Sequence, residues 1–85
     1  MELAVFIGEI RHAKAMHEKY AENLEKVNSF ESDRAAIEFY RKEAATYQIE
    51  RNKSETAIRR ALFKANGDAI IGLEKFISDY IRGRA

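Results

Sequence analysis

The sequence predicts an all-α protein: a small antiparallel bundle of three helices with a long central helix, completed by oligomerisation. The 85 residues contain no proline and only four glycines, so the chain lacks the frequent turn signals that an all-β protein of this length would need. Hydrophobic residues make up 46% of the chain and charged residues 34%, a composition typical of a folded domain. Apolar residues recur every three or four positions, which is the period of a helix. We therefore expect a single helical domain over residues 1–85.

The first helix is expected from about residue 2 to about residue 27. Its stripe follows the a and d positions of consecutive heptads, occupied by Leu3, Phe6, Ile10, Ala13, His17, Tyr20, Leu24 and Val27. His17 is the one ionisable imidazole on this stripe. It is interpreted as a structural residue, either a core histidine with a hydrogen-bonded partner or a polar position that sets the register of a coiled coil, or else as a buried switch that titrates near the ordinary pKa of about 6.5.

A turn is expected over residues 28–33, where several side chains can accept hydrogen bonds from free helix amides. Either Asn28 and Glu31 form a capping box, or Ser32 caps a helix that begins at Asp33. The central helix is expected from about 33 to 65, because no proline or glycine interrupts it. Seven consecutive polar residues, 50–56, leave a second interpretation open, in which they form a loop and Ser54 caps a new helix.

The third helix is expected over about 69–82, the most apolar stretch of the chain. Asn66-Gly67 is typical of a helix end with glycine in the left-handed position, and Asp68 can cap the helix that follows. A central helix of about 33 residues would be about 50 Å long, which exceeds both neighbours. Unless the chain bends, part of its apolar surface would then lack a partner within the chain, which predicts a homo-oligomer, most simply a two-fold dimer.

A cluster of basic residues late in the central helix is the candidate binding site. Only Glu50 and Glu55 oppose it in sequence, and the adjacent guanidinium groups of Arg59 and Arg60 suit bidentate phosphate binding. The alternative is a solvated helix face balanced by acidic residues of the first helix. The candidate residues are Arg51, Lys53, Arg59, Arg60 and Lys64.

Motifs of catalysis are missing from the sequence. There is no cysteine, glycine-rich phosphate loop, Gly-x-Ser-x-Gly elbow or His-Glu-x-x-His pair. Glu9 and His12 have the Glu-x-x-His spacing of a di-metal centre, but both fall outside the apolar stripe, so we expect a solvated face. The protein is therefore predicted not to be an enzyme, with no metal and no other cofactor.

The location is predicted from two further absences in the sequence. The N-terminal apolar run is too short for a signal peptide, and no segment approaches the roughly 20 apolar residues of a membrane span. We therefore expect a cytoplasmic protein that has no membrane segment.

Two short parts of the sequence carry a resemblance: Ile7-Gly8-Glu9-Ile10-Arg11 near the start, and Arg60, Asp68 and Gly72-Leu73 near the end. They are similar to small phage helical proteins that sequester cyclic oligonucleotide messengers. The resemblance covers a small part of the chain, and residues 28–56 have no counterpart in it. It implies a multimeric sponge whose basic side chains hold phosphates at subunit interfaces.

The expected function is therefore binding. The first hypothesis is a helical interaction module that binds or inhibits an as yet unidentified protein partner, as a homodimer. The alternative is a binder of phosphate-bearing ligands, either nucleic acid or a cyclic-nucleotide-type messenger, through the five basic residues.

Overall fold

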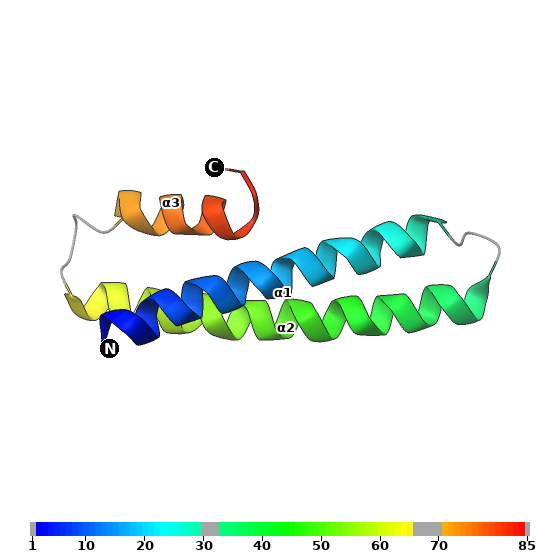
Figure 1. Cartoon of the computed structure of the whole chain (residues 1–85), viewed down its shortest axis with the longest axis horizontal. Coiled ribbons are helices and arrows are strands. Elements are labelled where there is room, and N and C mark those ends of the chain that lie inside the picture. The colour runs from blue at the N-terminus through cyan, green and yellow to red at the C-terminus, as the bar shows by residue number, and fades with distance from the viewer. Residues whose placement is uncertain (1, 30–32, 66–70, 85) are drawn as a thin grey trace.

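The computed structural model describes residues 2–29, 33–65 and 71–84 (Figure 1). Three helices account for nearly all of them: α1 (Leu3–Ser29), α2 (Arg34–Ala65) and α3 (Ile71–Ile81). These ranges contain no strand, and the all-α prediction is confirmed. The 32-residue α2 runs without a break through residues 50–56. The loop interpretation of this stretch is therefore wrong, and Ser54 lies buried inside the helix instead of capping one.

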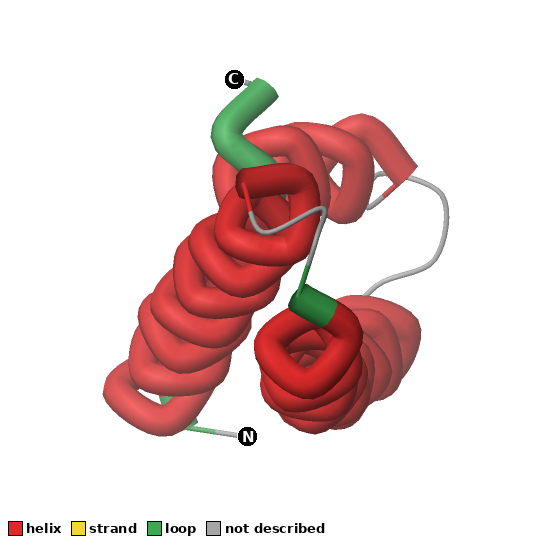
Figure 2. Tube along the Cα trace, turned by 90° about the vertical axis from the view of Figure 1, so that its right-hand side faces the viewer, coloured by secondary structure: helices red, strands yellow, loops and turns green. Residues whose placement is uncertain are grey.

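The helices form an antiparallel pair with a third helix at one end. α1 and α2 lie side by side along most of their length, and the molecule measures 50 × 21 × 17 Å. α3 runs in the direction of α1 and opposite to α2, and it covers only the N-terminal part of α1 and the C-terminal part of α2 (Figures 1 and 2). The three-helix arrangement with a long central helix is thus confirmed, but α3 packs against only one end of the α1–α2 pair.

The start of α2 is set by Asp33. Its Oδ1 accepts a hydrogen bond from the backbone N–H of Ala36 at 3.1 Å, which is the N-cap geometry. The expected helix start at Asp33 is wrong by one residue, because α2 begins at Arg34 and Asp33 is its cap; Ser32, the expected cap, lies outside the described residues. Asn28 lies inside α1, so it does not open a capping box; Glu31 lies outside the described residues.

The end of α3 is a Schellman motif centred on a glycine. Gly83 has a φ of 70°, and its N–H donates to the carbonyl of Tyr80 at 3.2 Å while that of Arg84 donates to the carbonyl of Asp79 at 2.7 Å. A side chain at position 83 would be strained in this left-handed conformation. The helix end predicted at Asn66-Gly67, and the cap predicted at Asp68, lie outside the described residues.

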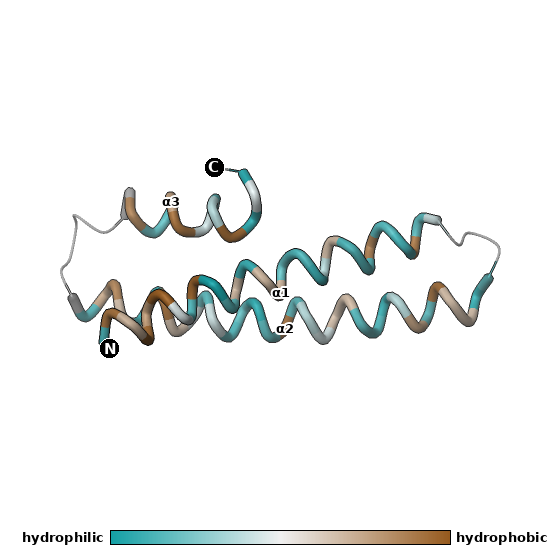
Figure 3. Tube along the Cα trace, in the orientation of Figure 1, coloured by the Kyte–Doolittle hydropathy of each residue, from teal (hydrophilic) through white to brown (hydrophobic). Residues whose placement is uncertain are grey.

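The hydrophobic core lies where the three helices meet. Its buried members come from all three helices, with Phe6 and Ile10 packed against them. These members are Ala13, Ile58, Leu62, Ile77 and Ile81. Apolar residues are concentrated at this end of the molecule (Figure 3). None of the helices, over their described residues, combines the length and hydropathy needed to cross a membrane.

Candidate functional site

A buried carboxylate, that of Glu55, lies at the junction of the three helices. Three guanidinium groups surround it: Arg51 Nε at 3.3 Å, Arg82 Nη2 at 3.2 Å and Arg59 Nη2 at 3.5 Å. The side chains of Glu55 and Arg51 are 6% and 5% exposed. Arg82 follows α3 directly, so this one carboxylate ties the C-terminal end of α3 to α2.

A second carboxylate extends the cluster toward the start of α3. Arg59 Nε donates to Glu74 Oε1 at 3.0 Å, which joins α2 and α3 again. The two side chains are 55% and 44% exposed, so water screens this pair and it contributes less to stability than the Glu55 contacts. We call Arg51, Glu55, Arg59, Glu74 and Arg82 the Glu55 network.

His17 connects the Glu55 network to α1. Arg51 Nη1 lies 2.9 Å from His17 Nδ1, and a guanidinium can only donate, so Nδ1 accepts and the imidazole is neutral with its proton on Nε2. Burial lowers the pKa of His17, and the positive charges of Arg51 and Arg82 lower it further, against an opposing effect of Glu55. Its contacts are those of a histidine that packs helices together, as the first of the two interpretations proposed.

The Glu55 network carries an excess of positive charge. Arg51, Arg59 and Arg82 are opposed by Glu55 and Glu74, which leaves three cations against two anions. Arg51 also donates from Nε and Nη2 to Asn52 Oδ1 at 3.2 and 3.1 Å, and its guanidinium lies 5.2 Å from the Tyr20 ring centroid. Burial, followed by the charge of Arg82, lowers the pKa of Arg51. Each nitrogen of the Arg51 guanidinium thus has a partner within the fold, so the network acts as a structural clamp.

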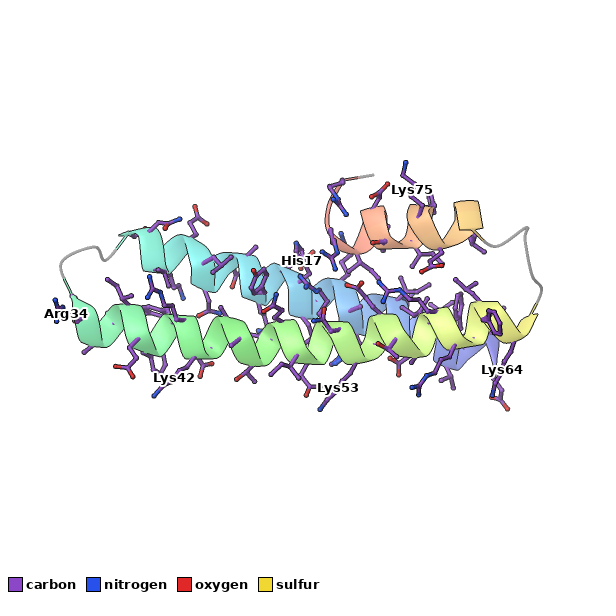
Figure 4. The ribbon with its side chains drawn as sticks, turned by 180° about the vertical axis from the view of Figure 1, so that it is seen from behind. His17, Arg34, Lys42, Lys53, Lys64 and Lys75 are labelled. Atoms are coloured by element: carbon purple, nitrogen blue, oxygen red, sulfur yellow. The ribbon has the colours of Figure 1, made fainter. Side chains whose placement is uncertain are left out.

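The five predicted site residues do not form one surface. Arg51 and Arg59 belong to the Glu55 network, where Arg51 is buried. Lys53, Arg60 and Lys64 are exposed on the opposite side of α2. Figure 4 shows Lys53 and Lys64 pointing away from the other helices. Lys53 Nζ pairs with Glu50 Oε1 at 3.3 Å, whereas within the described ranges Arg60 and Lys64 form no salt bridge.

The structural role of Glu55 and Arg82 is not predicted by the sequence analysis. The polar composition of residues 50–56 does not predict burial, yet Arg51, Ser54 and Glu55 are 4–5% exposed. A signal was present, because these three positions continue the three- and four-residue spacing of the buried face that includes Ile58. Arg82 gives no comparable signal, since its partner lies 27 positions away in sequence.

The predicted Glu-x-x-His pair lies on the surface of α1. His12 is exposed and Glu9 is partly exposed. Within residues 2–29, 33–65 and 71–84, no three His, Cys, Asp or Glu side chains come together in a group that could hold a metal ion.

α1 and α3 each carry a row of exposed apolar side chains. Leu73, Phe76 and Tyr80 follow one side of α3 and are 46%, 62% and 42% exposed, while Leu3 and Ile7 follow one side of α1 at 72% and 39%. We call these five residues the α1/α3 face.

The contact that joins the two rows is made by Lys14. Its Nζ lies 4.5 Å from the Tyr80 ring centroid and donates to the Tyr80 carbonyl at 3.2 Å. Ile7 precedes Lys14 by seven residues and Leu73 precedes Tyr80 by seven. Because α1 and α3 run in the same direction (Figure 1), both rows extend from this contact toward the N-terminal ends of their helices. The α1/α3 face therefore consists of two exposed rows that are joined at Lys14 and Tyr80.

No protein-family model, curated protein or solved structure matches this chain.

Proposed function

We propose that this protein is a non-enzymatic interaction module that associates with itself through the α1/α3 face and acts by binding a protein partner in the cytoplasm. The observation that carries the proposal is that two helices joined at Lys14 and Tyr80 expose five large apolar side chains. Exposed apolar residues that occur singly are ordinary, whereas contiguous patches mark interaction surfaces.

A second copy of the chain is the simplest occupant of this face. A two-fold interface places the same patch of both subunits in contact, and an apolar patch is complementary to itself without any pairing of charges. The formal net charge is only +1, so long-range repulsion between copies is small. Such a dimer would also place a partner against the N-terminal part of α1, where Leu3 is 72% exposed.

Size-exclusion chromatography with light scattering tests the proposal. Phe76→Glu places a charge in the middle of the α1/α3 face and should convert a dimer into a monomer, with helicity unchanged by circular dichroism. Phe39→Glu is the matched control, because Phe39 is similarly exposed, at 58% against 62%, but lies on the distant half of α2. Equal effects of the two substitutions would contradict the assignment of the face.

The second candidate function, binding of phosphate-bearing ligands, is supported by Arg60 and Lys64, which lack carboxylate partners among the described residues. Arg51 and Arg59 are already held by Glu55, so this candidate is limited to three of the five predicted residues. Arg60→Ala should then weaken binding of an oligonucleotide or cyclic nucleotide without loss of stability, and Arg59→Ala should mainly reduce stability. Unchanged affinity in Arg60→Ala would sink this candidate.

A further inference from the structure

The side of α2 that faces away from α1 and α3 carries a row of neutral and apolar side chains. Ile49, Thr56 and Phe63 are spaced by seven residues, about two helical turns, so they lie in line over about 21 Å. Ile49 is 55% exposed and Phe63 is 85% exposed, the highest exposure among the large hydrophobic residues described. These side chains have no hydrophobic cover within the described part of the chain.

A row of cations runs beside this apolar row. It consists of Lys53, Arg60 and Lys64, at spacings of seven and four residues. Arg60 and Lys64 are like charges four residues apart, an arrangement that destabilises a helix. The residue four before Arg60 is Thr56, so neither direction along α2 supplies a carboxylate at that spacing. A carboxylate from another molecule would relieve this repulsion.

The apolar row and the row of cations line a common depression on α2. A shallow, open depression between them is lined by Ile49, Asn52, Lys53, Thr56 and Arg60. We call this region, with Phe63 and Lys64 at its end, the α2 outer face. It is apolar along its middle and positive along one edge.

We infer that the α2 outer face docks an acidic amphipathic helix of a partner protein. Apolar side chains spaced by helical turns would pack on Ile49 and Phe63, and carboxylates along one edge would pair with Lys53, Arg60 and Lys64, in the manner of helix-in-groove recognition with electrostatic complementarity. Nucleic acid fits less well, because binding of single strands relies on several aromatic rings interleaved with cations. Here Phe63 is the one aromatic residue of the face.

This inference rests on the proposed function and names the chemistry of its protein partner. The two surfaces are separate: self-association uses α1 and α3, whereas the α2 outer face points away from both helices. Docking of the acidic helix therefore remains open to the dimer, and the two assignments can be tested independently.

Fluorescence anisotropy with a designed helical peptide tests the inference on the full-length protein. The probe has leucines along one face and glutamates at their flanks, and a reference peptide has lysine in place of every glutamate. We expect the acidic peptide to bind in a salt-sensitive manner and the basic peptide not to bind. Arg60→Glu and Lys64→Glu should each weaken binding by about tenfold or more.

The matched control is Lys75→Glu, which makes the same change of charge on an exposed residue of α3 and should leave the affinity unchanged. Phe63→Ala should weaken binding, whereas Phe39→Ala should not. Circular dichroism of each variant separates loss of binding from loss of folding.

Several outcomes would overturn the inference. One is equal binding of the acidic and basic peptides; another is capture of a single-stranded oligonucleotide or of phosphatidylserine vesicles in place of the acidic peptide. A third is a change in self-association caused by Arg60→Glu, which would assign the face to a second copy of the chain. Light scattering on the same samples distinguishes the two proposals, because a dimer that ignores the acidic peptide overturns only this inference.

Discussion

Replacement of Glu55 by glutamine should destabilise the protein by about 3 kcal/mol or more, because removal of one partner from a buried ion pair leaves the other charge buried and unpaired. The carboxylate is 6% exposed and contacts Arg51, Arg82 and Arg59 at 3.2–3.5 Å. The side chains of Arg82 and Arg59 are 32% and 55% exposed, so water screens much of their charge. Most of the cost therefore arises at Arg51, which is 5% exposed.

The size of this effect can be compared with the stability of the whole fold. At roughly 0.05–0.15 kcal/mol per residue, a domain of this length unfolds with a free energy of about 4–13 kcal/mol. Loss of one carboxylate would remove a large part of that amount. Because Glu55 also holds Arg82, α3 should separate from α2 at lower denaturant than the α1–α2 pair unfolds.

Urea denaturation followed by circular dichroism measures the change in the free energy of unfolding. The control is Glu50→Gln, which removes a more exposed carboxylate from the same helix. The side chains of Glu50 and its partner Lys53 are 43% and 70% exposed, so this ion pair should contribute less than about 1 kcal/mol to the free energy of unfolding. Equal losses for the two variants would refute the view that the Glu55 network clamps α3 onto α2.

Two further predictions concern pH and the end of α3. The pKa of His17 is lowered from 6.5 in the folded protein, first by burial and then by Arg51 and Arg82. As the pH falls below about 6.5, the unfolded state therefore binds more protons than the folded state. The contribution of His17 to the free energy of unfolding should therefore be complete above about pH 7 and decrease on acidification, by at most about 1.4 kcal/mol per pH unit for one proton. His17→Gln should flatten the dependence of this free energy on pH between pH 8 and 6. The control His12→Gln, at an exposed position, should not. Gly83→Ala should lower the free energy of unfolding by about 1 kcal/mol, because φ is 70° at this position. Gly8→Ala in α1 should raise the free energy of unfolding, because an added Cβ meets nothing within 4 Å there. A stabilising effect of Gly83→Ala would argue against the Schellman motif.

The helices could be predicted from the sequence because the signals are local. Uninterrupted periodicity without proline or glycine predicts α2 over 33–65, and the structure places it at Arg34–Ala65. The nature of residues 50–56 is ambiguous in the sequence because burial of Arg51 and Glu55 depends on contacts with residues outside α2. His17 and Arg82 supply those contacts, and their positions in space are not encoded in any short segment.

The candidate site was only partly predictable for a related reason. The five basic residues were grouped because they are close in sequence, but a helix turns by 100° per residue. Arg51 and Arg59 therefore face α3 and the core, and Lys53, Arg60 and Lys64 face away. In α3, the sequence shows a strongly apolar helix, but only packing determines that Ile77 is buried while its neighbour Phe76 is 62% exposed.

Sedimentation equilibrium of the unmodified protein over a concentration series tests the central claim, self-association through the α1/α3 face, most directly. The chain has a mass of 9.8 kDa, and we predict a weight-average mass that approaches twice this value as concentration rises, together with a monomeric mass for Phe76→Glu at the same concentrations. A mass of 9.8 kDa at every concentration for the unmodified protein would contradict the account.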